Sequence, residues 1–190
     1  FAVPYSTREV VKAFKDDIHE GDLFLHNDPY TGGTHLNDVL LLHPVFNEGK
    51  LALFAAMRCH WNDVGGMTPG SLSGRVKEIY QEGIRITPTR ICEKGVMNQA
   101  VLDALFNNMR GPEERIGDFN AMLGTGRKAA EHLQRLFERF GGDALIDGVE
   151  ALIDRSERQM RSRISDCPDG DYFAEGYIES DGSNPDPLVI

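Results

Sequence analysis

The sequence predicts an α+β (mixed α/β) fold, in which a β-hairpin and glycine-rich metal-site loops precede a long antiparallel helical hairpin. In the first half, apolar runs of strand length at residues 39–46 and 51–59 flank a turn. In the second half, apolar residues recur at steps of three and four between residues 112 and 164. We therefore divide the chain into a β-rich metal-site region (1–95), a helical hairpin region (96–166) and the start of a further β region (167–190).

The first half is expected to contain one helix, three strands and a long loop. A Ser-Thr-Arg-Glu capping box at residues 6–9 predicts the start of a short helix that ends before Gly21. Residues 22–26 have the composition of a strand, and the turn at 47–50 joins the strands of the hairpin. Residues 65–90 are rich in Gly, Pro and Ser, and long loops of this kind in compact domains are usually functional.

The second half is predicted to be helical up to about residue 164. Pro112 suits the first turn of a helix, and Gly141-Gly142 separates it from the next one. The glycines of Gly124-Thr125-Gly126 lie within the helical repeat, so they are expected to allow close packing and not to bind phosphate.

Two short strands are expected near the end of the chain, around Asp181-Gly182. The second of them, at 188–190, finds no obvious neighbour in the sequence. We therefore interpret the chain as a fragment of a larger subunit, prone to aggregate when expressed alone.

Composition limits the classes of partner. The 190 residues are 41% hydrophobic and 26% charged, which is typical of a globular protein, and the formal net charge of −10 disfavours nucleic acid and anionic membranes. No apolar run approaches the roughly 20 residues that span a bilayer. The three cysteines are few and lack ligand spacing, so we expect a reducing, cytoplasmic setting.

Two His-x-x-Asp units, His35/Asp38 and His60/Asp63, each lie beside a Gly-Gly pair. Residues three apart in a strand point to opposite faces, so the two side chains of a unit converge only if the backbone turns, which paired glycines permit. The predicted hairpin brings both units to its open end. Two imidazoles and two carboxylates suit zinc, manganese or iron. The alternative is that the aspartates only cap turns and the histidines are ordinary polar residues.

Other chemistry is disfavoured by the sequence. No dinucleotide fingerprint follows a strand, and the nucleophile elbow of a serine hydrolase is absent. Cys59 adjoins His60, but adjacent strand residues face opposite ways, so packing is the better interpretation of Cys59. Glu78 is expected to be solvated, and the role of Glu82 stays open.

The motif Asn-Asp-Pro-Tyr-x-Gly-Gly-Thr-His-x-x-Asp at residues 27–38 resembles a signature of the hydantoinase B/5-oxoprolinase family. Residues 60–71 and 78–86 are similar to the next two family blocks, and residues 168–172 and 181–182 to later elements. One departure is His60-Trp61, where many family members have a His-His pair, and Trp61 is expected to reshape the pocket.

The resemblance implies a B-type subunit of a cytoplasmic, ATP-dependent enzyme that hydrolyses a small cyclic amide. It implies a hetero-oligomer, in which a hydantoinase A-type subunit uses ATP to activate the substrate. It also implies that a divalent transition metal (Mn, Zn or Fe) is held by His35, Asp38 and His60, with Asp63 as the general base or a fourth ligand. Asp28 would orient a ligand. Two alternatives remain: an ATP-driven ketone carboxylase subunit of the same broad family, and a non-catalytic assembly subunit.

Overall fold

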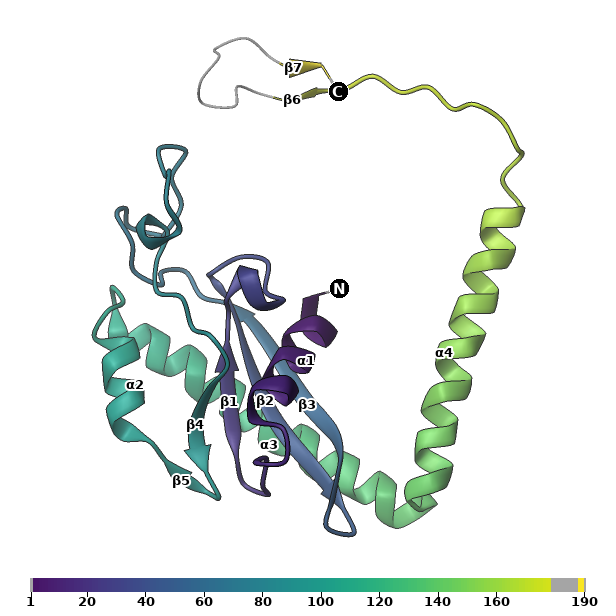
Figure 1. The fold of residues 1–190 in the computed structure, drawn as a ribbon, viewed down its shortest axis with the longest axis horizontal. Coiled ribbons are helices and arrows are strands. Elements are labelled where there is room, and N and C mark those ends of the chain that lie inside the picture. The colour runs from purple at the N-terminus through teal and green to yellow at the C-terminus, as the bar shows by residue number, and fades with distance from the viewer. Residues whose placement is uncertain (1, 179–187, 190) are drawn as a thin grey trace. The chain divides into compact units, whose positions relative to one another are not determined.

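A five-stranded antiparallel sheet forms the centre of the computed structural model, which describes residues 2–178 and 188–189 (Figure 1). The strands lie in the order β3-β2-β1-β4-β5. Their bounds are Leu23–His26 (β1), Asp38–Asn47 (β2), Lys50–His60 (β3), Thr89–Glu93 (β4) and Val96–Met97 (β5). The combination of this sheet with long helices confirms the predicted α+β class.

The hairpin of β2 and β3 is the longest paired segment of the sheet. Its two-residue turn is formed by Glu48 (φ 51°) and Gly49 (φ 74°), and positive φ at both positions is the requirement of a tight type I′ connection. The register shifts once, between Val45 and Phe46, and then runs regularly to the open end, where Asp38 pairs with His60. The predicted hairpin and its turn are confirmed.

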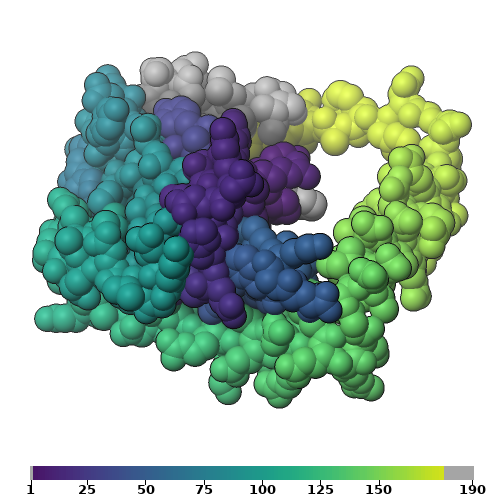
Figure 2. Space-filling model, turned by 60° about the horizontal axis from the view of Figure 1, so that its bottom comes forward, coloured from purple at the N-terminus to yellow at the C-terminus, as the bar shows by residue number. Residues whose placement is uncertain are grey.

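One face of the sheet is covered by α1 (Ala2–Phe14), which Figure 2 shows in purple beside the blue hairpin. Val10 and Ile18 pack there with Phe24, Leu40 and Leu42 in one buried cluster. The helix begins well before residue 6, so the predicted capping box was wrong. Ser6 is instead a buried helical residue, and its hydroxyl donates to the carbonyl oxygen of Gly32 at 2.9 Å.

The other face carries α2 (Gln99–Phe106) and α3 (Pro112–Phe140). The ring of Phe106 lies between Trp61 and Phe119, with centroids 6.0 and 5.6 Å away. Gly126 of α3 lies so close to β3 that a Cβ there would be 2.3 Å from Cε of Met57. The expected close packing is therefore present at Gly126, and the partner is the sheet.

Two short 3₁₀ helices interrupt the long connections. They are η1 (Pro29–Thr31), within the glycine-rich loop, and η2 (Ile79–Gln81), within the loop that leads to β4. The chain divides into two compact units, Phe1–Arg139 and Phe140–Ile190. The three regions proposed from the sequence stay a prediction.

The second unit contains α4 (Gly142–Ser165), which follows Gly141 at φ 80°, and the strands β6 (Tyr177–Ile178) and β7 (Leu188–Val189). The antiparallel packing of α3 against α4 stays a prediction, because the two helices belong to different units. β6 and β7 pair with each other, so the expectation that the last strand lacks a neighbour was wrong. Asp181-Gly182 lies outside the described residues.

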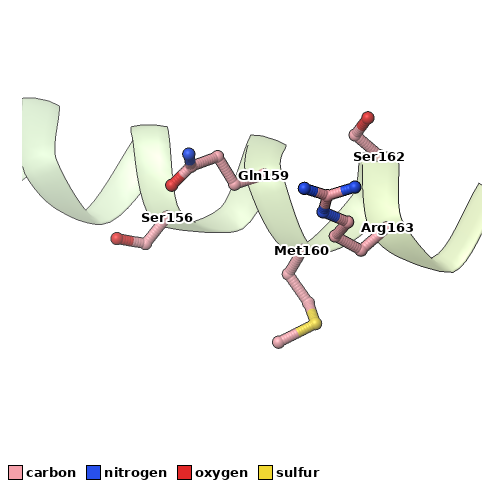
Figure 3. A pocket seen from close by; sticks show the side chains of 5 residues that line it. All are labelled: Ser156, Gln159, Met160, Ser162 and Arg163. Atoms are coloured by element: carbon pink, nitrogen blue, oxygen red, sulfur yellow. The ribbon is translucent and has the colours of Figure 1, made fainter.

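A hollow on α4 is bordered by Ser156, Gln159, Met160, Ser162 and Arg163 (Figure 3). All five side chains come from one helix and point away from it in different directions, so they do not form a converging set of polar groups of the kind a binding site needs. Within the described residues, no helix combines the length and the apolar character needed to cross a membrane.

Candidate metal centre

His35, Asp38 and His60 meet at the open end of the hairpin. Asp38 is the first residue of β2 and His60 the last of β3, and the two are direct partners in the register. Nδ1 of His60 lies 2.9 Å from Oδ1 of Asp38, and the rings of His35 and His60 have centroids 5.2 Å apart. One potential ligand atom from each of the three residues lies within 4.8 Å of the other two.

Strand alternation explains which side chains reach this end of the sheet. Asp38, Arg58 and His60 share the face that α1 covers, because residues two apart in a strand point the same way. Trp61 points to the opposite face, where it is fully buried against Phe106. The expectation that Trp61 reshapes the pocket was therefore wrong, since this side chain belongs to the core behind the site.

Asp38 is held from two sides. Its Oδ2 accepts hydrogen bonds from Arg58 and, at 3.4 Å, from the hydroxyl of Thr34, while its Oδ1 faces His60. Partial burial alone would raise the pKa of Asp38, but the hydrogen bond with His60 and the charge of Arg58 outweigh it and hold the pKa below its ordinary value. Asp38 is therefore an ionised carboxylate at neutral pH.

The donor set fits a borderline transition metal. Two imidazole nitrogens and one carboxylate oxygen are the ligands that zinc, manganese and iron share, and three protein ligands leave positions for water or substrate. The side chain of His60 is 56% exposed and that of Asp38 24%, so solvent and a small molecule can reach the donor atoms.

Asp63 is not part of this group. Its carboxylate accepts hydrogen bonds from the backbone N–H groups of Gly65 (2.7 Å) and Gly70 (2.8 Å), and Arg110 lies 3.3 Å away. Burial would raise the pKa of Asp63, but these partners lower it. The geometry therefore gives Asp63 the task of shaping the loop at 63–70, and it does not support the predicted role as a general base or ligand.

Asp28 is likewise a structural group of its loop. Its buried carboxylate accepts from the backbone N–H of Tyr30 at 3.2 Å and from the hydroxyl of Thr31 at 2.9 Å, which caps η1. Glu82 is the residue that follows η2 and lies outside the His/Asp group, and Glu78 is exposed as expected.

Two buried asparagines were missed by the sequence analysis. Asn27 donates to the carbonyls of Leu36 (2.7 Å) and Ile84 (3.0 Å), and Asn37 donates to that of Trp61 (2.6 Å). Asparagine in a glycine-rich segment usually indicates a turn. Nothing in the spacing of these two shows that their amides reach across to other segments.

Cys59 is half-buried on the face opposite His60. Burial and the nearby carboxylate of Asp118 raise the pKa of its thiol, which disfavours the thiolate. This agrees with packing as the role of Cys59.

A family model described as hydantoinase B/oxoprolinase matches residues 1–189. The chain therefore belongs to the hydantoinase B/oxoprolinase family, as its motifs indicated.

Among curated relatives, the chain is 36% identical to the beta subunit of the caprolactamase of Pseudomonas jessenii over 177 residues, which cover 93% of this chain and 30% of that protein. It is 35% identical over 182 residues to the B subunit of a putative D-/L-hydantoinase of Pseudomonas sp. strain NS671, covering 95% and 31%. The crystal structure of the ATP-dependent caprolactamase from Pseudomonas jessenii matches with a TM-score of 0.87 at 34% identity, covering 94% of this chain and 31% of that one. The chain thus spans about 30% of the length of these relatives.

Proposed function

We propose that the chain is part of the B-type catalytic subunit of a cytoplasmic, ATP-dependent enzyme that hydrolyses a small cyclic amide of the hydantoin or 5-oxoproline type. The observation that carries the proposal is the group of His35, Asp38 and His60 at the open end of the hairpin, in a chain of the hydantoinase B/oxoprolinase family. The caprolactamase relative is named for the cleavage of a cyclic amide, which supports this substrate class.

His35, Asp38 and His60 would hold a divalent transition metal (Mn, Zn or Fe). When bound, such an ion would polarise a carbonyl or lower the pKa of a bound water. The chain's own contribution is orientation: Arg58 and Thr34 fix one oxygen of Asp38 and leave the other toward His60. Asp63 stays a prediction as the proton acceptor, and both of its carboxylate oxygens already accept hydrogen bonds from the backbone of its own loop.

ATP would be used by a hydantoinase A-type partner in a hetero-oligomer. Two observations support this division of labour. The sequence contains no phosphate-loop or dinucleotide fingerprint, and the caprolactamase of known structure is described as ATP-dependent. The partner would activate the cyclic amide, and the B-type subunit would complete its hydrolysis.

The test is product analysis with the full-length subunit and an A-type partner, supplied with ATP and hydantoin, 5-oxoproline or caprolactam. We expect a ring-opened amino acid or carbamoyl product, and its loss in the variant His60→Ala. A product that requires bicarbonate and gains a carboxyl group would identify a carboxylase instead. Equal turnover by wild type and by the His35→Ala and His60→Ala variants would show that the chain acts only as a non-catalytic assembly subunit.

A further inference from the structure

The residue that follows each of the two histidines is held by a buried asparagine. Asn27 donates to the carbonyl of Leu36, which follows His35, and Asn37 donates to the carbonyl of Trp61, which follows His60. Asn27 is 1% exposed and Asn37 is 2% exposed. Two amides thus make equivalent contacts at two places that lie far apart in the sequence.

We propose that Asn27 and Asn37 are positioning residues of the metal centre, each of which fixes the backbone beside one histidine ligand. The proposal rests on the proposed function, because it takes His35 and His60 as the ligands. Neither asparagine is proposed as a metal ligand, because its side-chain amide already donates a hydrogen bond to a backbone carbonyl.

Asn37 closes the hairpin one position beyond the pair of Asp38 and His60. The backbone N–H of Trp61 donates to the carbonyl of Asn37 at 2.7 Å, and the amide of Asn37 returns a hydrogen bond to the carbonyl of Trp61 at 2.6 Å. A strand end without such a closure is free to fray. The double link therefore holds Asp38 and His60 at their register position and keeps their side chains on the same face.

Asn27 joins the glycine-rich loop to the segment that precedes β4. Its backbone N–H donates to the carbonyl of Ile86, its side-chain oxygen accepts from the N–H of Ile86 at 2.6 Å, and its amide donates to Leu36 and Ile84. The loop that carries His35 is thereby anchored to β1 at Asn27 and to a segment that lies much further along the chain.

Energetics favours a positioning role over simple filling of the core. A buried amide costs free energy unless its hydrogen bonds are made, and an apolar residue would fill the same space without that cost. What the amide adds is a fixed location for the carbonyl that it binds. Groups that orient metal ligands in this way typically change metal affinity by about 10- to 100-fold when they are removed.

The experiment is a titration of the chelator-treated, full-length subunit with Co²⁺ alone, followed by its visible absorption spectrum, with circular dichroism as the check of folding. The variants are Asn37→Ser, which keeps a shorter donor, and Asn37→Leu, which keeps a similar shape and loses the donor without adding a charge. Asn62→Ala, an exposed asparagine two residues after His60, is the matched control. His60→Ala tests the ligand assignment itself.

We expect the affinity for Co²⁺ to fall by about 10- to 100-fold in Asn37→Leu and less in Asn37→Ser, with a changed spectrum, and to stay at the wild-type value in Asn62→Ala. A folded Asn37→Ser and a folded Asn37→Leu that both bind Co²⁺ like wild type would overturn the positioning role without contradicting the metal centre. Equal binding by wild type and His60→Ala would overturn the metal centre and the positioning role together. If Asn37→Leu fails to fold, Asn37→Ser decides.

Discussion

Asp38 and His60 are 22 residues apart in the sequence and direct partners across the β2–β3 ladder, with Oδ1 and Nδ1 2.9 Å apart. The relationship depends on the two-residue turn at Glu48 and Gly49 and on the register shift between Val45 and Phe46, because the turn alone would place Asp38 opposite Cys59. A shift of one residue would send one of the two side chains to the face where Trp61 is buried. The site is thus built by strand register as much as by its loops.

Removing either histidine should empty the metal centre. In the full-length protein we expect about one equivalent of transition metal per chain by elemental analysis, and a marked loss of metal in His35→Ala and in His60→Ala, because two ligands hold a divalent ion poorly. His132→Ala, an exposed histidine on α3, is the control and should keep its metal. Full occupancy in both ligand variants would contradict the assignment.

The strands of the hairpin and the extent of α3 could be predicted from the sequence, because period-2 and period-3.6 patterns and turn residues are local signals. The start of α1 could not, because Ser6 has the chemistry of a cap yet is used to bind the carbonyl of Gly32. Burial of that hydroxyl is a tertiary contact, and a single sequence does not reveal it.

The candidate site, too, was predicted only in part, because some of its contacts are tertiary and are not visible in a single sequence. The hairpin brings Asp38 and His60 to the same end, and the register shift between Val45 and Phe46 makes them direct partners. Asp63 follows the same His-x-x-Asp spacing, but Gly65 and Gly70 offer their N–H groups and Arg110 approaches from after α2, so its carboxylate is turned into the loop. Which of two identical motifs contributes its aspartate is decided by these backbone donors, which residue types do not disclose.

Asp63→Asn should destabilise the protein in a pH-dependent way. The folded-state pKa of Asp63 is below the ordinary value of 3.8, so its carboxylate stabilises the fold fully above pH 3.8, and this contribution is lost as pH falls through the lower folded-state pKa. We expect a clearly lower melting temperature for Asp63→Asn at pH 7 and a smaller difference from wild type near pH 3. Calorimetry at both values checks this. A difference that is independent of pH would show that charge on Asp63 does not matter.

Asp63→Asn should also separate a loop role from a catalytic one. If Asp63 only shapes residues 63–70, the variant enzyme should retain measurable turnover with its A-type partner at a temperature where it is folded, and the pH profile of the rate should keep its shape. A loss of the acidic limb of that profile, where a general base becomes protonated, would restore Asp63 as the proton acceptor.

ATP turnover should require the partner subunit. The purified full-length B-type subunit, incubated with ATP and a cyclic amide, is expected to release no phosphate above background, and release should begin when an A-type subunit is added. A phosphate-release assay with each subunit alone and with both together measures this. Sustained ATP hydrolysis by the B-type subunit alone would contradict the proposed division of labour.

Gly66→Ala should disrupt the loop that follows β3. Gly66 has φ of +87°, and a Cβ there would lie 2.5 Å from the carbonyl oxygen of Gln81 and 2.7 Å from the carbonyl carbon of Glu82. The backbone conformation alone costs an L-residue about 1–2 kcal/mol, and the clash with main-chain atoms adds to that cost because backbone cannot rotate away. Gly74→Ala is the matched control, since its Cβ would meet no atom within 4 Å, and its effect should stay within about 0.5 kcal/mol. Denaturant unfolding of the two variants gives the comparison, and equal stability would mean that the loop at 65–83 is not held against Gly66 as the structure has it.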